Sequence, residues 1–257
     1  MKRTPIATYP SDMPPELAAL CRGAELYDSS CSPQARVIYI DRDGGYFLKV
    51  SDKGTLRAEA EMDRYFYKKG LGAQVLCYDS LERDWLLTRR VAGEDATHTR
   101  YLSEPERLAR TLGRLLRELH SRDIADCPVS DKMNDYFALV DKNYRDGAYD
   151  LSYCGLASAD EAYAVARDGR ELLSGDTLIH GDYCLPNIIF DDWRFSGFID
   201  LGLGGVGDRH IDLFWGAWTL RFNLGTDKYR DIFFDAYGRE NINEDALRVV
   251  AAAETFG

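Results

Sequence analysis

The stretch Leu178–Phe190 reads LIHGDYCLPNIIF, and it decides how the rest of the chain is interpreted. It begins with aliphatic side chains, turns at His180 and Gly181, and ends in a second apolar run. Short apolar runs separated by a turn that contains Gly and Pro are typical of two strands joined by a loop. This loop holds Asp182 and Asn187, five positions apart, and such polar residues between two buried strands indicate a functional site.

A further acid, Asp200, directly follows the apolar pair Phe198-Ile199. Apolar runs predict short strands at 177–179, 188–190 and 195–199, so Asp200 lies at a strand end. Mg²⁺ binds through one or two carboxylates together with the phosphates of a substrate. A hydrogen-bonded turn and a strand-end cap would explain any one of these polar residues, but not the ordered set. The order resembles that of protein kinases, in which an Asp, an Asn five residues on and a later Asp-x-Gly serve phosphoryl transfer.

The first ninety residues are predicted to be rich in β-structure. Strands are expected at 35–40, 46–50, 74–78 and 85–88, with a turn at 41–45 and a helix over 55–69. Lys49 lies within a strand, where it could reach the α- and β-phosphates of a nucleotide. Glu61 and Glu59 on the helix are rival partners for this lysine, about 200° apart around the helix axis. We choose Glu61.

The second half is predicted to be mainly helical. Ser103-Glu-Pro-Glu106 matches a capping box, and leucines at helical spacing follow up to His120, which we interpret as a hydrogen-bonded structural histidine. Asp208–Leu224 is predicted as a buried helix. The patterning is lost at 91–96, which indicates a hinge. We therefore expect an α+β, protein-kinase-like fold of two lobes, with a small β-rich nucleotide-binding lobe at 1–92 and a larger, mainly helical catalytic lobe at 93–257.

Composition limits the possible functions. The 257 residues carry a net charge of −11, which argues against nucleic-acid binding because such binding rests on a basic surface. There is no apolar run long enough to span a membrane and no export signal, so the six widely spaced cysteines are expected to be reduced and the protein cytoplasmic. No obligate protein partner is evident. Residues 93–257 contain 18 basic and 30 acidic side chains, an excess that would attract a cationic partner.

Taken together, these motifs resemble the aminoglycoside 3′-phosphotransferases, bacterial antibiotic-resistance enzymes with a kinase-like fold. The resemblance covers most of the chain and includes the segments YFLKVSDKGT, LHSRDIADCP, HGDYCLPNIIF, FSGFIDLG and GDRHIDLFW. It implies that Asp182 orients and deprotonates the acceptor hydroxyl, while Asn187 and Asp200 hold Mg²⁺ on the phosphates of ATP.

The resemblance also implies nucleotide contacts in the first ninety residues. Lys49, braced by Glu61, would contact the α- and β-phosphates, and the loop of Ser32 would cover the β-phosphate. Phe47 would stack on adenine, whose edge would meet the backbone of Arg89 to Val91.

For the substrate, the resemblance implies a cationic aminoglycoside bound through Asp131, Asp182 and a C-terminal tail that contains Glu254 and Phe256. Two positions depart from the family pattern. Leu203 stands where the family commonly has an arginine in an Asp-x-Gly-Arg motif, and Ala253 stands where an additional acid is usual. The loss of one carboxylate contact to a drug ammonium would cost about 1–3 kcal/mol.

Three alternatives remain open at this point. A kinase of the same fold could act on another hydroxyl acceptor, such as a sugar, choline or a macrolide. A metal-dependent phosphohydrolase could bind a transition metal through histidines and carboxylates, here His180, Asp182, Asp208, His210 and Asp212. A nucleotide-binding module without catalysis is disfavoured, because the set of acids is complete.

Overall fold

The computed structural model describes residues 3–31 and 34–257, which form two compact units. The first unit runs to residue 95 and also takes residues 188–202; the second comprises residues 96–187 and 203–257. The division made from the sequence, after residue 92, leaves 188–202 in the other part. Two contacts tie this segment into the first unit: β7 pairs antiparallel with β9, and the amide of Phe198 donates to the carbonyl of Leu71 at 2.7 Å.

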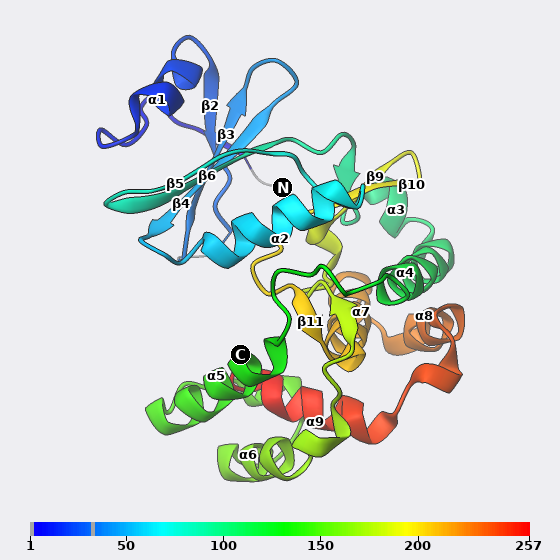
Figure 1. The fold of residues 1–257 in the computed structure, drawn as a ribbon. Coiled ribbons are helices and arrows are strands. Elements are labelled where there is room, and N and C mark those ends of the chain that lie inside the picture. The colour runs from blue at the N-terminus through cyan, green and yellow to red at the C-terminus, as the bar shows by residue number, and fades with distance from the viewer. Residues whose placement is uncertain (1–2, 32–33) are drawn as a thin grey trace. The chain divides into compact units, whose positions relative to one another are not determined.

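The first unit is built on an antiparallel sheet of order β1-β2-β3-β4-β6-β5, with β7, β9 and β10 in a second small sheet (Figure 1). The strand predicted at 46–50 is observed as Tyr46–Asp52, and it pairs with both β3 and β6, which places it inside the sheet. Its elements are β1 Thr4–Pro5, α1 Pro15–Cys21, β2 Glu25–Asp28, β3 Arg36–Asp41, β4 Tyr46–Asp52, α2 Arg57–Lys68, β5 Val75–Ser80, β6 Arg83–Arg89, β7 Glu94–Asp95, β9 Ile188–Asp191 and β10 Arg194–Phe198.

Alternation of apolar and polar residues places one face of this sheet in a core. Ile38, Leu48 and Trp85 are almost completely buried and belong to one cluster. The start of α2 is satisfied from the sheet, because the carboxylate of Asp84 accepts from the amides of Gly54 and Leu56, both at 2.9 Å. A buried aspartate on β6 thus fixes where α2 begins, and with it the face that α2 turns toward β4.

The second unit is mainly helical. Its elements are α3 Thr99–Leu102, α4 Pro105–His120, α5 Lys132–Asp146, η1 Leu151–Tyr153, α6 Ala159–Asp168, η2 Arg170–Leu172, β8 Thr177–Ile179, η3 Leu185–Asn187, β11 Gly205–Gly207, α7 Arg209–Leu224, η4 Asp227–Tyr229, α8 Arg230–Tyr237, η5 Arg239–Asn241 and α9 Glu244–Glu254. β8 and β11 form an antiparallel pair, and α9 packs against α6 and α7. The segregation of strands and helices confirms the predicted α+β class.

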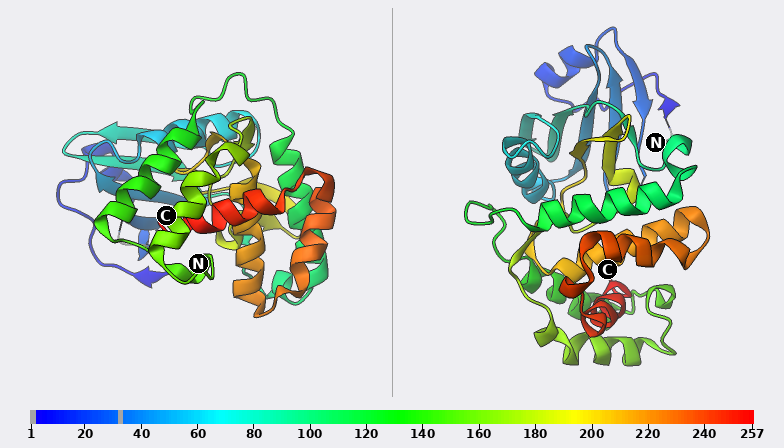
Figure 2. Two further views of the ribbon diagram at one scale, coloured as in Figure 1. Left: turned by 90° about the horizontal axis from the view of Figure 1, so that it is seen from below. Right: turned by 90° about the vertical axis from the view of Figure 1, so that its right-hand side faces the viewer.

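The leucine repeat of α4 is buried as its spacing predicts, and α4 and α8 pack side by side (Figure 2). Gly113 permits this close approach, because a Cβ at this position would lie 2.3 Å from the carbonyl oxygen of Phe233 on α8. The predicted capping box is wrong. Ser103 ends the preceding helix α3 and donates to the carbonyl of Arg100, whereas α4 starts at Pro105 without a side-chain cap.

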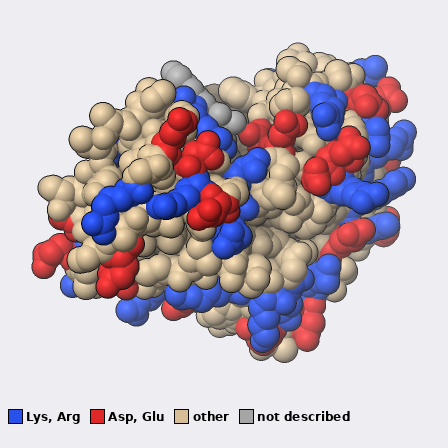
Figure 3. Space-filling model, turned by 90° about the horizontal axis from the view of Figure 1, so that it is seen from above, with Lys and Arg blue, Asp and Glu red and all other residues tan. Residues whose placement is uncertain are grey.

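Charged side chains of both signs lie interspersed on the face drawn in Figure 3, which is typical of a solvated surface. In the part of the chain that the structure describes, no helix combines the length and the apolar character that a membrane span requires.

Candidate active site

Three charged side chains meet in the first unit. The Nζ of Lys49 on β4 lies 2.8 and 2.9 Å from the carboxylate oxygens of Glu59 on α2, and 2.7 Å from Oδ1 of Asp200. Burial works to lower the pKa of Lys49, but the carboxylates of Glu59 and Asp200 outweigh it, so that the pKa is raised. The lysine is therefore a fixed ammonium whose two partners define its direction.

This geometry corrects the choice of Glu61 as the partner of Lys49. Glu61 is exposed, whereas Glu59 is buried and makes the ion pair. The reason is the phase of α2. Glu59 lies on the same face as Leu56 and Phe66, which are buried, and Glu61 lies about 200° away from it.

Asp200 is held in an uncommon backbone conformation directly after β10. Its φ is +62°, a left-handed value that aspartate tolerates better than most residues. Its side chain remains half exposed while one oxygen contacts Lys49. The carboxylate is thus fixed at one end and open to a ligand at the other.

The second unit holds the loop that connects β8 to η3. The Nδ2 of Asn187 donates to Oδ2 of Asp182 at 2.8 Å and to its carbonyl at 3.1 Å. The amide of Cys184 also donates to the carbonyl of Asp182, at 2.8 Å. These bonds fix one oxygen of the Asp182 carboxylate and keep the half-buried side chain in one orientation.

Asp212 on α7 stabilises this loop through hydrogen bonds. It is completely buried and accepts from the amides of His180 and Gly181 at 2.7 and 2.8 Å, and its Oδ2 lies 3.1 Å from Nε2 of His120. Gly181 has a φ of +85°, and a Cβ there would lie 2.1 Å from the carbonyl oxygen of Leu203. Only glycine fits this turn.

The supporting role of Asp212 was not predicted from the sequence, where it was considered as a possible metal ligand of a phosphohydrolase. The signal that was available is a histidine, His120, expected to be hydrogen-bonded but without a named partner. The structure supplies Asp212 on one ring nitrogen and the hydroxyl of Tyr237, at 2.9 Å, on the other. The expectation that His120 is structural is confirmed.

The remaining nucleotide residues lie on or beside the sheet of the first unit. Phe47 is two positions before Lys49 on β4, so both side chains are on the same face of the strand. Arg89 ends β6 and its guanidinium lies over the ring of Tyr46, and Val91 packs near Gly197. Ser32 lies outside the described residues. The nucleotide contacts of these four residues stay predictions.

Among the substrate residues, Asp131 is an exposed N-cap of α5, and its carboxylate accepts from the amide of Asn134. Phe256 is enclosed, with its ring edge-on to those of Tyr144 and Tyr163. In this structure Phe256 anchors the C-terminal tail. Contacts of both residues with a substrate stay predictions.

Glu254, the last residue of α9, is almost completely buried. Its Oε1 accepts from the hydroxyl of Tyr136 at 2.9 Å, and it also accepts from the side chain of Trp215. Burial raises the pKa of Glu254 to about 7, which the hydrogen bonds oppose and the nearby carboxylates of Asp182 and Asp212 reinforce. Glu254 thus belongs to the electrostatic surroundings of Asp182, and its binding of substrate stays a prediction.

The residues of the metal-dependent hydrolase alternative have other roles. Asp208 caps α7 and accepts from the amide and Nδ1 of His210, whose Nε2 accepts from the amide of Asn243. The carboxylate of Asp212 is already used to accept hydrogen bonds from the amides of His180 and Gly181. Over residues 3–31 and 34–257, no three His, Cys, Asp or Glu side chains are grouped so as to hold a metal ion among themselves. The geometry therefore speaks against that alternative.

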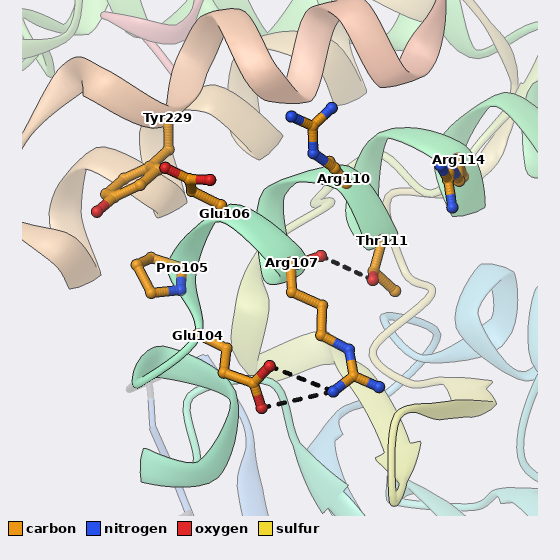
Figure 4. A pocket seen from close by; sticks show the side chains of 8 residues that line it. All are labelled: Glu104, Pro105, Glu106, Arg107, Arg110, Thr111, Arg114 and Tyr229. Carbon is orange, nitrogen blue, oxygen red and sulfur yellow. Dashed lines mark hydrogen bonds and ion pairs between the residues drawn. The ribbon is translucent and has the colours of Figure 1, made fainter.

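A surface hollow of about 630 Å³ lies elsewhere in the second unit, along α4 (Figure 4). Three arginines (Arg107, Arg110, Arg114) and two glutamates (Glu104, Glu106) line it, and Arg107 forms an ion pair with Glu104. It contains none of the predicted site residues. Its lining carries one positive charge more than negative charges, so it does not favour a cationic substrate.

Comparisons with known proteins identify the family of the chain. Residues 27–250 match the model of the phosphotransferase enzyme family. A probable aminoglycoside 3′-phosphotransferase from Lactococcus lactis is 48% identical over 248 residues, which are 95% of each chain.

Solved structures of this kind share the fold. The crystal structure of an aminoglycoside 3′-phosphotransferase of type VIII superposes with a TM-score of 0.78 at 25% identity, covering 94% of this chain and 97% of the other. An aminoglycoside phosphotransferase from Streptomyces rimosus, solved in complex with ADP and streptomycin, gives a TM-score of 0.71 at 22% identity over 86% of this chain and 90% of the other. The kinase-like fold predicted from the sequence is confirmed, and the chain belongs to the aminoglycoside 3′-phosphotransferases of the phosphotransferase enzyme family.

Proposed function

We propose that this chain transfers the terminal phosphoryl group of ATP to the 3′-hydroxyl of aminoglycosides and thereby inactivates these antibiotics. The observation that carries phosphoryl transfer is the Lys49 ammonium held between Glu59 and Asp200 at 2.7–2.9 Å. Family membership through a relative that is 48% identical over nearly the full length supports the aminoglycoside as acceptor. The need for ATP also supports the predicted cytoplasmic location.

Asp182 is the proposed base. One of its oxygens is held by the side-chain amide of Asn187, and the carboxylate would accept the proton of the acceptor hydroxyl. As the 3′-oxygen bonds to the γ-phosphorus, the bond from that phosphorus to the bridging oxygen breaks, ADP leaves, and the hydroxyl proton passes to the Asp182 carboxylate. Such a transfer needs mainly positioning and charge stabilisation.

Lys49 would bind the α- and β-phosphates and stabilise the charge that builds up on ADP. In the described structure its ammonium is already oriented by two carboxylates, so little ordering would remain when the nucleotide binds.

Mg²⁺ fits the donors present. The half-exposed carboxylate of Asp200 and the amide oxygen of Asn187, whose nitrogen is used for Asp182, are oxygen ligands of the kind this ion prefers. When bound, the ion would neutralise the charge of the phosphates.

The acceptor is tested by mass spectrometry after incubation of the protein with MgATP and a set of drugs. Kanamycin and neomycin, which carry a 3′-hydroxyl, are expected to gain one phosphoryl group. Tobramycin, which lacks that hydroxyl, is the matched control and is expected to stay unmodified. Phosphorylation of a simple sugar, choline or a macrolide without phosphorylation of kanamycin would overturn the proposal.

A further inference from the structure

Aromatic side chains on α7 and η1 form a continuous surface in the second unit. Neighbouring ring centroids are 5.6 Å apart for Tyr153 and Trp215, 5.4 Å for Trp215 and Trp218, and 4.9 Å for Trp218 and Phe222. The last two rings are stacked, with 12° between their planes. We refer to these four residues, together with Phe214, as the aromatic strip.

The strip packs on the core at one end, where Phe214 and Trp215 contact a buried cluster, and is exposed at the other. Phe222 is 71% exposed and the other members are only half buried. Trp215, Trp218 and Phe222 follow at helical spacing on one face of α7, while Leu213 and Leu220 bury another face. Contiguous exposed aromatic surface is uncommon on a folded protein unless it binds something, so the strip calls for a ligand.

The strip lies next to the loop of Asp182. Thr219, the residue after Trp218, accepts through its Oγ1 from the amide of Leu185 at 3.2 Å. α7 is therefore joined to the Asp182–Asn187 loop at the middle of the strip.

Carboxylates lie beside Trp215 and Tyr153, at one end of the strip. Trp215 donates to the buried Glu254. Burial, followed by the carboxylates of Asp150, Glu254 and Asp182, raises the pKa of the Tyr153 hydroxyl. Aromatic faces and negative charge thus occur together beside the proposed base.

We propose that the aromatic strip binds the rings of the aminoglycoside other than the one that is phosphorylated, and that it determines which drugs are accepted. The proposal rests on the proposed function. Aminoglycosides are chains of amino-sugar rings, and the face of an indole or phenyl ring attracts an ammonium group. A ring whose 3′-hydroxyl meets Asp182 would leave its neighbours along α7, over Trp218 and Phe222.

The test compares drugs of different length in the variants Phe222→Ala and Trp218→Ala. For neomycin, which has four rings, each substitution is expected to raise KM by about tenfold, in line with the strength of a partly desolvated cation–π contact. The kcat for neomycin, and the KM for the two-ring fragment neamine, are expected to change by less than about twofold, because neither depends on the outer rings.

Tyr67→Ala is the matched control, since Tyr67 is a half-exposed aromatic residue on α2, in the other unit. It is expected to leave all these constants unchanged. Equal effects of Phe222→Ala on neomycin and neamine would overturn the strip as a binding surface for the outer rings. So would an unchanged KM combined with loss of a dimer in sedimentation, which would make the strip an interface between copies of this chain.

Binding without nucleotide separates this inference from the proposed function. Neomycin is expected to quench the tryptophan fluorescence of the wild-type protein, with Kd raised about tenfold by Phe222→Ala. Quenching that is weakened by this substitution, in a protein that phosphorylates no aminoglycoside, would support the strip and refute the function. Phosphorylation with no change of Kd in the variant would refute the strip alone.

Discussion

The cluster of Lys49 and the loop of Asp182 hold their reactive groups in different ways. The Lys49 ammonium is held by two carboxylates, Glu59 and Asp200, at ion-pair distance. Asp182 has no cation among its described hydrogen-bond partners; amides of Asn187 and Cys184 hold it instead. Ion pairs fix the group that is proposed to bind phosphates, and neutral hydrogen bonds fix the group that is proposed to accept a proton.

The difference follows from the roles proposed for the Lys49 ammonium and the Asp182 carboxylate. A cation that binds phosphates gains from a partner that keeps it charged and oriented, whereas a base paired with a cation would lose its affinity for the proton. The carboxylates of Asp182 and Asp212 in turn reinforce the raised pKa of the neighbouring Glu254.

Asp182→Asn is expected to give the largest effect, because it removes the proposed base while keeping the size of the side chain. The turnover number should fall by about 10²–10⁴-fold. Steady-state kinetics with kanamycin measures this, and thermal unfolding should show a midpoint close to that of the wild type. Turnover within a few-fold of the wild type would exclude Asp182 as the base.

Asp212→Ala is expected to destabilise the second unit, because it leaves the buried amides of His180 and Gly181 without an acceptor. Each unpaired amide costs about 1–3 kcal/mol, so the free energy of unfolding should fall by about 2–6 kcal/mol. Urea denaturation measures the change. Asp245→Ala, on an exposed carboxylate of α9, is the control and should stay within about 0.5 kcal/mol of the wild type.

Glu254→Gln is expected to change how stability depends on pH. The pKa of Glu254 is about 7 in the folded protein and 4.5 in an unperturbed chain, so the folded state binds the additional proton between these values. Stability that this residue supports is therefore complete below about pH 4.5 and is lost as the pH rises to 7, by roughly 3 kcal/mol.

The glutamine variant should lack this loss. The difference between the unfolding free energies of wild type and variant, measured from pH 5 to 8, isolates the contribution of Glu254. A difference that does not vary with pH would show that Glu254 does not titrate in this range, which would contradict its raised pKa.

Glu59→Gln and Glu61→Gln form a pair that tests the correction on α2. The first variant loses a charge-assisted partner of Lys49, and kcat/KM for ATP should fall by about tenfold. The second alters an exposed side chain and should change kcat/KM by less than about twofold. Equal losses in both variants would contradict the observed phase of the helix.

Local patterns predicted most elements of the sheet and the central helices. The strands around Lys49, the helix with the leucine repeat and the buried helix α7 all follow from periodicity. α1 and the strands beside it were missed, because residues 4–15 contain four prolines and show no periodic pattern. The capping box failed because a helical turn, α3, precedes it and uses Ser103 as its own end.

What the sequence could not give depends on contacts between distant segments. The inclusion of residues 188–202 in the first unit rests on pairing with β7 and on a hydrogen bond from Phe198 to Leu71, both between segments that are far apart in the sequence. The spacing of Asp182 and Asn187 indicated a common loop, but not the support from Asp212. The choice of Glu59 over Glu61 could have been made from the sequence. Leu56, Met62 and Phe66 define an apolar stripe on the predicted helix, and this stripe includes Glu59.

The position of the phosphate on the product tests the central claim most directly. Kanamycin converted with MgATP can be purified and analysed by phosphorus–proton correlation NMR. A phosphorus nucleus coupled to the proton on the 3′ carbon is the predicted result. A phosphate on any other hydroxyl, or no phosphorylated product from the wild-type protein, would contradict the account.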